Sequence, residues 1–421
     1  MTRRAADLRE PAATVETPAP DRALPQPVAR SLLLVTVLYL FATSRWGSHV
    51  KVPGLPVYAG DVLVVASLVQ TAVVVRRTGT TWSDVRAALA QAHLALLLTL
   101  AFLGWVALRA AVGVGDLLAD PLTGLRDLAP YGYAVVALLA FLVPSRDGAG
   151  QRRWVYAALG FHLVWVVLAP WLPGFPWSSL SLGNTTVFES RPDFDSAVLG
   201  IAAALALSDV LHGWGSLPGR TRLGLSLFAL ANLYGLATLL TRAGLLAGIV
   251  AVVSVGLAWG LRGMTGRDLF GRRGLVVVLV LACVAVVALL SPPGQRLVGA
   301  FGGGDAQSTG TLQARETTWS GVSEYVLSDA VRTAVGVGFG PDFLTLSGTT
   351  DALEGGDYEN VRSPHNYLVG TFARLGLGGA LLAGCVLAAA GFLGLSRLAR
   401  PSGAVTTVAA LTVLTLPVTA L

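Results

Sequence analysis

Residues 223–261 read LGLSLFALANLYGLATLLTRAGLLAGIVAVVSVGLAWGL, a nearly continuous apolar stretch. A membrane-spanning helix needs about 20 mostly apolar residues, so this stretch is too long for a single crossing. The dipeptide Thr241-Arg242 interrupts it near its middle. We therefore predict two spanning helices, at 223–240 and 243–261, joined by a tight turn at Arg242.

Similar apolar runs recur along the whole chain of 421 residues, of which 54% are hydrophobic and 13% are charged. A soluble domain carries roughly 25% charged residues. The sequence therefore predicts an all-α fold, a polytopic membrane helix bundle with about 11–12 transmembrane helices. Besides the two runs above, apolar runs cover residues 31–45, 60–75, 92–112, 127–144, 154–172, 194–212, 274–291, 375–395 and 404–421.

The distribution of arginines predicts how these helices are oriented. If the N-terminus lies inside, most of the 30 basic residues fall in cytoplasmic segments, as the positive-inside rule requires. The net charge of +6 then reflects membrane topology, and we expect no nucleic-acid partner. The same orientation places residues 173–193, the turn at Arg242 and the long polar segment 292–364 outside the membrane.

The predicted topology divides the chain into four parts. Residues 1–28 are rich in proline, alanine and charge, and lack the apolar region of a signal peptide, so we expect a disordered cytoplasmic tail. Residues 29–291 hold transmembrane helices 1–9. Residues 292–364 form a long extracytoplasmic loop with a short amphipathic helix around RETTWSGVSEYVLSDA. Residues 365–421 hold the C-terminal transmembrane helices.

Three arginines on the predicted outer side are candidates to bind an anion. Arg242 stands in LLTRAGLLAG at the outer end of a helix pair, Arg191 precedes the helix at 194–212, and Arg315 opens the amphipathic helix. A planar guanidinium binds phosphate oxygens through paired, charge-assisted hydrogen bonds. The alternative for Arg242 is snorkelling to the lipid headgroups, and for Arg191 and Arg315 an ordinary surface charge.

One histidine lies at the predicted outer mouth of a helix. In SPHNYLVGTFARLGLGG, residues 363–379, His365 follows a proline and precedes Asn366. A histidine titrates near neutral pH and suits a general base, while Asn366 would orient its imidazole or cap the helix. Arg374 in the same stretch faces the lipid headgroups or makes a fourth phosphate contact. The other histidines are interpreted as structural: His49, His93, His162 and His212.

The remaining motifs carry weaker signals. GVGFGPDF, residues 336–343, fits a sharp turn better than a phosphate cradle, because nothing around it has the strand–loop–helix pattern of a nucleotide site. Cys283 and Cys385 both lie in apolar runs, so we expect small core residues and no disulfide. No His, Cys, Asp and Glu cluster has the spacing of a metal site, and we expect neither a metal nor another cofactor.

Four segments together resemble the O-antigen ligase/polymerase family of bacterial integral-membrane glycosyltransferases. They are Thr241-Arg242-Ala243-Gly244, Arg315 with Trp319, the glycine turn at 336–343, and His365-Asn366-Tyr367-Leu368 followed by Gly376-Leu377-Gly378-Gly379. Each is weak alone, whereas their order along residues 220–395 is fairly specific. The sequence RPDFDS at 191–196 departs from the asparagine usual there, so Arg191 matches less well.

The resemblance implies glycan transfer at the outer face of the bacterial cytoplasmic membrane, by a multi-pass protein with an extracytoplasmic active site. The donor would be a glycan linked to undecaprenyl diphosphate, and the acceptor a hydroxyl of a glycan or lipid. His365 and Asn366 would be catalytic, and Arg242, Arg315 and Arg191 would bind the diphosphate. Ligase and polymerase differ in the acceptor, which these residues do not identify.

Other functions for such a chain are a membrane transporter or a flippase of lipid-linked precursors. Coupled transporters carry ionisable groups in mid-membrane, and the apolar runs here contain few. Cell-wall elongation polymerases have a similar helix count and a long outer loop. Protein mannosyltransferase-like enzymes place acids in the first outer loop, where this chain has none before Asp61. A purely structural membrane protein is the remaining alternative.

Overall fold

The structure is a computed structural model that describes part of the chain. The described residues are 93–132, 149–168, 181–182, 185–186, 192–239, 242–261, 306–350, 364, 366–399 and 403–419, with isolated positions 65, 69, 73, 76, 83 and 86. The predictions for the tail 1–28 and for the apolar runs 31–45 and 274–291 lie outside the described residues.

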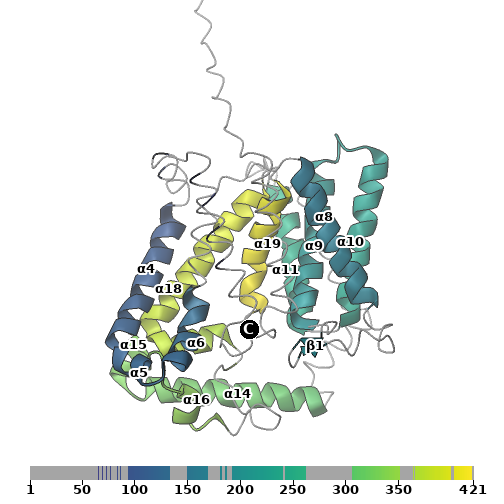
Figure 1. The fold of residues 1–421 in the computed structure, drawn as a ribbon. Coiled ribbons are helices and arrows are strands. Elements are labelled where there is room, and N and C mark those ends of the chain that lie inside the picture. Colours follow the sequence, from purple (N-terminus) through teal and green to yellow (C-terminus); the bar gives the residue numbers. More distant parts are fainter. Residues whose placement is uncertain are drawn as a thin grey trace, which may run out of the picture.

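The described elements are helical apart from one short hairpin, in which the two-residue strand β1 (Ser181–Leu182) pairs antiparallel with the two-residue strand β2 (Thr185–Thr186). Figure 1 shows their arrangement. In chain order the helices are α4 (His93–Val112), α5 (Val114–Ala119), α6 (Pro121–Gly132), α8 (Ala149–Leu168), α9 (Pro192–His212), α10 (Gly219–Leu239), α11 (Arg242–Leu261), α14 (Ala306–Leu327), α15 (Ala330–Val335), α16 (Phe343–Leu346), α18 (Tyr367–Leu398) and α19 (Ala404–Thr419).

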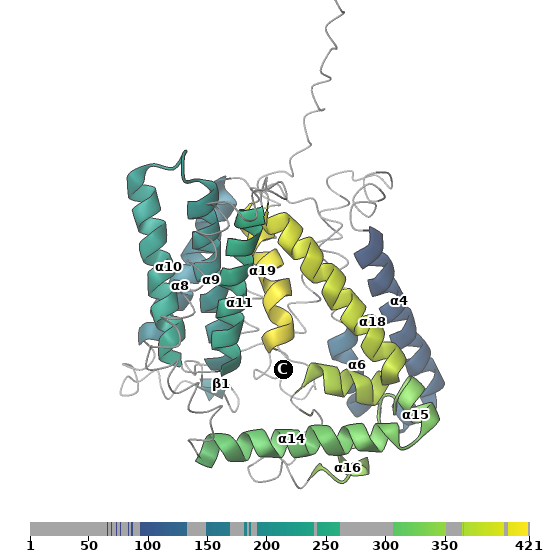
Figure 2. The ribbon, with the colours of Figure 1, turned by 180° about the vertical axis from the view of Figure 1, so that it is seen from behind.

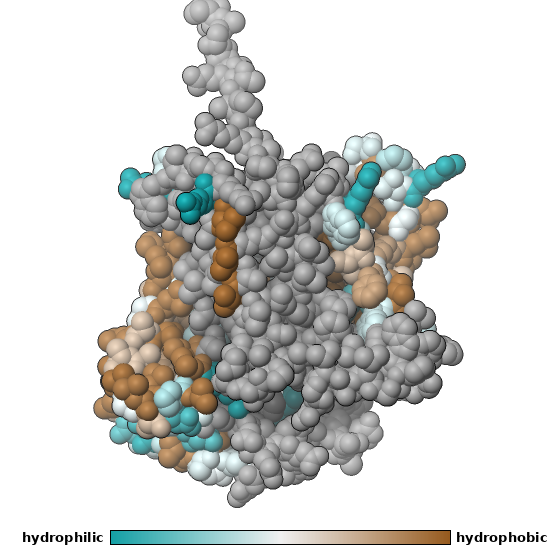
Figure 3. All heavy atoms as spheres, in the orientation of Figure 1, coloured by the Kyte–Doolittle hydropathy of each residue, from teal (hydrophilic) through white to brown (hydrophobic). Residues whose placement is uncertain are grey.

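Four of the described helices are long and apolar enough to cross a membrane: Leu94–Val112, Asp195–His212, Gly219–Leu239 and Tyr367–Leu398. The predicted break at Thr241-Arg242 is confirmed, because α10 ends at Leu239 and α11 begins at Arg242. Among the described residues, α4 and α10 expose large apolar side chains such as Leu97, Leu108, Leu227 and Leu230. Figure 3 shows hydrophobic side chains on the flanks and hydrophilic ones gathered towards the upper and lower ends. A lipid-facing surface has this pattern.

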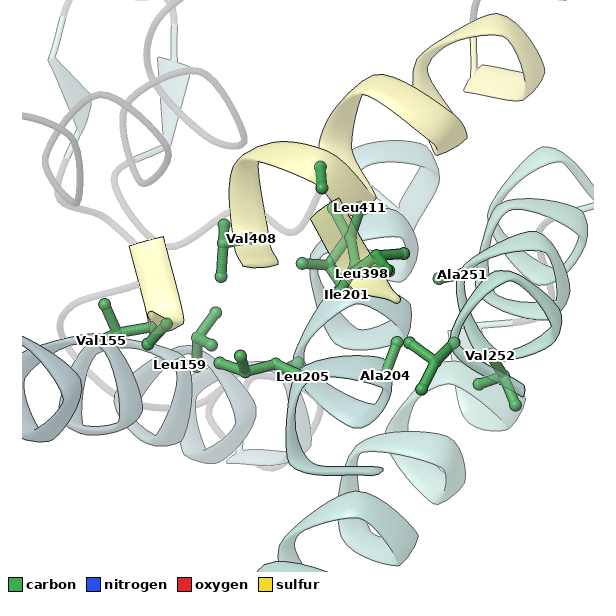
Figure 4. Close-up of a cluster of buried hydrophobic side chains, with 14 of the residues drawn as sticks. Val155, Leu159, Ile201, Ala204, Leu205, Ala251, Val252, Leu398, Val408 and Leu411 are labelled. Carbon is green, nitrogen blue, oxygen red and sulfur yellow. The ribbon is translucent and has the colours of Figure 1, made fainter. Parts of the chain in front are cut away.

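The main core surrounds α9, which packs against α8, α10, α11 and α19; these five helices are called the α9 bundle. Figure 4 shows Leu205, Val252 and Leu411 among its buried side chains. Gly200 on α9 lies against Gly248 on α11 so closely that a Cβ at Gly200 would come within 2.5 Å of the Gly248 Cα. Glycines therefore let these two helices approach each other without intervening side chains.

Helix α18 is broken at Gly376, which has φ 66° and ψ −168°. The first segment of α18, residues 367–375, lies near α14 in Figure 2, and residues 377–398 rise away from it into the bundle. The predicted spanning run at 375–395 therefore corresponds to the second segment. Within the glycines at 376–379, Gly376 breaks the helix, and Gly378 lets α18 pack closely on α4, since a Cβ there would lie 2.9 Å from the Trp105 ring.

Candidate functional site

Helix α14 lies across one end of the molecule (Figure 1). The N-terminal ends of α9, α11 and α18 lie at this same end in both ribbon views (Figures 1 and 2). Helix α14 contains most of the short helix that was predicted around residues 315–330, but it is longer than expected and begins at Ala306. Extending an existing helix adds one hydrogen bond per residue fixed, so the polar residues before 315 join it at little cost.

A buried stripe on α14 fixes its orientation. Thr318, Val322 and Val326 are each fully buried and recur every four residues, which is the spacing of one helix face. This face packs against Phe343 of α16 and Ala373 of α18. The opposite face exposes polar side chains, namely Gln313, Glu316, Thr317, Ser320 and Glu324. One face of α14 is therefore buried against protein, and the other is polar and exposed.

Trp319 connects α14 to the segment that precedes α18. Its indole Nε1 donates a hydrogen bond of 2.7 Å to the carbonyl oxygen of Pro364. Arg315 lies four residues earlier on α14, half-buried, and residues four apart are neighbours on a helix surface. The structure therefore brings two of the predicted elements together: the Arg315–Trp319 face and the segment that contains His365.

Asn366 is the N-cap of α18. Its backbone is extended, and its side-chain Oδ1 accepts hydrogen bonds from the backbone N–H groups of Leu368 and Val369 at 2.9 and 3.1 Å. Capping, one of the two predicted roles of Asn366, is thus present. His365 itself lies outside the described residues, but Pro364 and Asn366, the residues on either side of it, are both buried and hydrogen-bonded.

The glycine loop, Gly336–Gly340, completes the backbone hydrogen bonds that the break in α18 leaves open. In an unbroken helix the carbonyls of residues 373–375 would bond to N–H groups four residues later. Here Ala373 accepts from the N–H of Val337 at 2.8 Å and Arg374 from that of Gly338 at 3.0 Å. Leu375 accepts from the indole N–H of Trp105 at 3.0 Å. All three carbonyls have partners, as irregular backbone near a membrane requires.

Two glycines allow the glycine loop and the break in α18 to approach each other this closely. Gly336 has φ 75° and ψ −178°, and Gly376 has φ 66° and ψ −168°, a region of backbone conformation that is essentially restricted to glycine. A Cβ on Gly376 would lie 2.5 Å from the Ala334 carbonyl. The loop's N–H groups at Val337 and Gly338 bond to protein carbonyls, so the expected turn is confirmed and these groups do not form a phosphate cradle.

Three charged side chains are buried around the glycine loop. Arg374 Nη2 lies 2.7 Å from Asp127 Oδ1, and both side chains are less than a tenth exposed. The other carboxylate oxygen of Asp127 accepts from the N–H of Gly340 at 3.2 Å. Arg109, in the last turn of α4, donates to the carbonyl of Gly336 at 3.1 Å. Arg374 therefore makes a buried internal ion pair, which contradicts the first of the two alternatives for it, facing the lipid headgroups.

An aromatic cluster packs beside these charges. The ring of Tyr131 on α6 lies 6.1 Å from that of Phe102, 5.7 Å from that of Phe339 and 6.1 Å from that of Tyr367, measured between ring centroids. This cluster joins α4, α6, the glycine loop and the first segment of α18.

The five predicted site residues are described to different extents. Arg315 and Asn366 are described and lie in the neighbouring elements above. Arg242 is the first residue of α11, but its side chain lies outside the described residues, as do Arg191 and His365. Among the residues that the structure describes, no three His, Cys, Asp or Glu side chains lie close enough to hold a metal ion.

Buried acids are more numerous than the sequence analysis assumed. Asp127, Asp195 and Asp209 are each less than a tenth exposed, although all three fall within predicted apolar runs. His162 on α8, interpreted as structural, is also buried, and its Nε2 lies 3.4 Å from Asp195 Oδ1 on α9. An ionisable residue inside an apolar run is by default a candidate for function, and this rule would have selected these residues.

Comparisons with known proteins do not identify the family of this chain. No protein-family model matches it, and no curated protein shows a significant match to its sequence. The resemblance to the O-antigen ligase/polymerase family therefore stays a prediction that rests on the four motif segments of the sequence.

Proposed function

We propose that this protein transfers or polymerises a polyprenyl-diphosphate-linked glycan onto an acceptor hydroxyl at the outer face of the cytoplasmic membrane. The observation that carries the proposal is the hydrogen bond from Trp319 to Pro364. It brings the face of α14 that bears Arg315 to the segment that contains His365. Arg315 and the residues that flank His365 in the chain are thereby held at one end of an apolar helix bundle, where a lipid-linked substrate would present its diphosphate.

The proposal includes a specific membrane topology. The chain would have about 11–12 spanning helices with its N-terminus inside and residues 292–364 outside. In this orientation α14 is extracytoplasmic and lies along the membrane surface, and the N-terminal ends of α11 and α18 face the same side. The polar face of α14 and its apolar contacts with α16 and α18 suit such an interfacial position.

The proposed chemistry is a substitution at the anomeric carbon of the donor glycan. The acceptor oxygen forms a bond to that carbon, the bond from the carbon to the diphosphate oxygen breaks, and undecaprenyl diphosphate leaves with the electron pair. His365 takes the proton of the acceptor hydroxyl. Arg242, Arg191 and Arg315 stabilise the negative charge that grows on the leaving diphosphate. Ligase and polymerase activities share these steps.

The direct test uses purified protein in vesicles with an undecaprenyl-diphosphate-linked glycan and a glycan acceptor. A general base is typically worth about 10²–10⁴ in rate, so His365→Ala should lower turnover by that factor. Arg315→Ala and Arg242→Ala should also slow transfer strongly. His212→Ala and Arg397→Ala are matched controls, since these residues lie in the last turns of α9 and α18, at the ends away from α14. Wild-type rates in correctly inserted His365 and Arg242 variants would rule the proposal out.

A cellular experiment gives an independent check. A strain that lacks the protein should accumulate lipid-linked oligosaccharides on the outer leaflet, because the flipped donor would no longer be consumed. The same strain complemented with Arg397→Ala should clear them, and complementation with His365→Ala should not. Absence of accumulation in the deletion strain would argue against this function.

A second candidate is transport or flipping of a lipid-linked precursor, favoured by the buried pair His162–Asp195. Such pairs between bundle helices occur along proton and ion pathways. In vesicles without any acceptor, a proton-coupled carrier would move its substrate, and Asp195→Asn would abolish this movement. Ser254→Ala, at a buried uncharged position on α11, serves as the control. No movement in the wild type would dismiss this candidate.

A further inference from the structure

We propose that Asp127 and Arg374 are positioning residues that set where the first segment of α18 holds its N-cap, Asn366, relative to α14. The positioning itself is a property of the fold. Its catalytic consequence rests on the function proposed above.

The pair connects three separate elements. Arg374 belongs to the first segment of α18, Asp127 to α6, and the two side chains meet at 2.7 Å. Arg374 also donates to the Gly338 carbonyl at 3.4 Å, and Asp127 accepts from the Gly340 N–H at 3.2 Å. The glycine loop is therefore bonded to both members of the pair. The guanidinium carbon of Arg374 further lies 4.9 Å from the centre of the Phe343 ring.

The location of the pair beside the break in α18 makes it important for orientation. A continuous helix fixes the direction of its first turns through its own hydrogen bonds, whereas the break at Gly376 interrupts them. Tertiary contacts must then decide the angle of the first segment. Arg374 is two residues from the break and supplies the buried ion pair there. Arg109 holds the first residue of the glycine loop, because it donates a hydrogen bond to the Gly336 carbonyl.

A small change in the helix angle at Gly376 would displace Asn366, at the far end of the first segment, by a larger distance. At 1.5 Å per residue, the helix from Arg374 back to Asn366 is about 12 Å long. A tilt of about 10° at the break would move its far end by about 2 Å. A misplacement of about 1 Å in a reacting group can lower a rate by about 10²-fold. Loosening the pair should therefore affect turnover although neither residue touches substrate.

The Asp127–Arg374 ion pair is better explained by the orientation that it gives the first segment of α18 than by a contribution to the stability of the fold. Apolar residues in place of a buried ion pair often leave a protein as stable or more stable, whereas removal of one partner leaves an unpaired buried charge. The useful variant is therefore the neutral double substitution Asp127→Asn with Arg374→Met. It leaves no unpaired charge, keeps an acceptor for the Gly340 N–H and removes the attraction that aligns the segment.

The test measures geometry and catalysis separately on the full-length protein. Spin labels replace Ser320 on α14 and Leu368 on the first segment of α18, both exposed, in a background with Cys283→Ser and Cys385→Ser. In the neutral double variant the thermal midpoint should stay near wild type, while the distance distribution between the labels broadens. In the unlabelled protein, kcat for glycan transfer should fall about 10²-fold with KM changed less than about threefold.

Two variants serve as controls. Arg374→Lys keeps an ion pair with Asp127 and should keep the distance distribution close to wild type. Asp116→Asn with Arg126→Met removes an exposed acid and an exposed arginine from α5 and α6, and should change neither distances nor kcat.

The outcomes separate this inference from the proposed function. A distribution as narrow as wild type in the neutral double variant would overturn the positioning role, and a broadened one with unchanged kcat would overturn its catalytic consequence. If the wild type transfers no glycan and the distribution still broadens, the proposed function fails while the pair's control of the segment is supported.

Discussion

The α9 bundle and the layer around α14 are held together in different ways. The α14 layer comprises α14, α15, α16, the glycine loop and the first segment of α18. In the α9 bundle the helices are regular and pack through small and aliphatic side chains, with Gly200 against Gly248. In the α14 layer a helix is broken, and hydrogen bonds from a loop and from Trp105 replace those that the break removes.

This difference follows from where backbone polar groups find partners. A regular helix satisfies its own N–H and C=O groups, so the backbone of the bundle helices needs no partners from other segments. An irregular segment needs partners from elsewhere in the chain, and its position then depends on several specific contacts. Such segments can hold polar groups in fixed places, which is what a site for a charged lipid head requires. Substitutions that affect one mode of packing should therefore leave the other mostly intact.

The largest expected effect is at the break itself. Gly376→Ala would force a Cβ into a glycine-only backbone region and within 2.5 Å of the Ala334 carbonyl. We expect a loss of at least about 3 kcal/mol in the free energy of unfolding, or failure to fold. Gly384→Ala is the matched control in the same helix, since nothing lies within 4 Å of its Cβ position. Thermal unfolding of both variants in detergent compares them, and equal midpoints would contradict the account of the break.

The next effect concerns the α9 bundle. Gly200→Ala would bring a methyl group within 2.5 Å of the Gly248 Cα, so α9 and α11 must separate, at a cost of about 1–3 kcal/mol. Gly224→Ala on α10, with open space around it, should be neutral or slightly stabilising. The same thermal assay checks this. If Gly200→Ala also broadened the distance between labels at Ser320 and Leu368, the two regions would not be independent.

A smaller effect is expected at the cap of α18. Asn366→Ala removes the acceptor for two backbone N–H groups and should lower the free energy of unfolding by about 1 kcal/mol. Asn366→Ser retains a capping oxygen and should recover most of that loss. Amide hydrogen exchange at Leu368 and Val369 reports the cap directly, and unchanged protection in the alanine variant would refute its role.

Much of the fold could be predicted because local sequence carries its signals. The spans of α4, α9, α10 and α11 follow from apolar runs, and the boundary at Arg242 follows from one polar dipeptide. The cap at Asn366 and the turn at the glycine loop are also local, since both depend on residue types at fixed short spacing. The candidate site was predictable only as a set of residues on the expected outer side. Its geometry was not, because the contacts join distant segments.

By itself, the sequence determined that this is an apolar, mainly helical chain with helices of membrane-spanning length, because hydropathy and helix length are properties of consecutive residues. Only the tertiary structure decided that Arg374 pairs with Asp127, that Trp319 binds the Pro364 carbonyl and that His162 meets Asp195. Each of these pairs joins two elements far apart in the chain. A charge or an indole N–H seeks any suitable partner, and which one it reaches depends on how the helices pack.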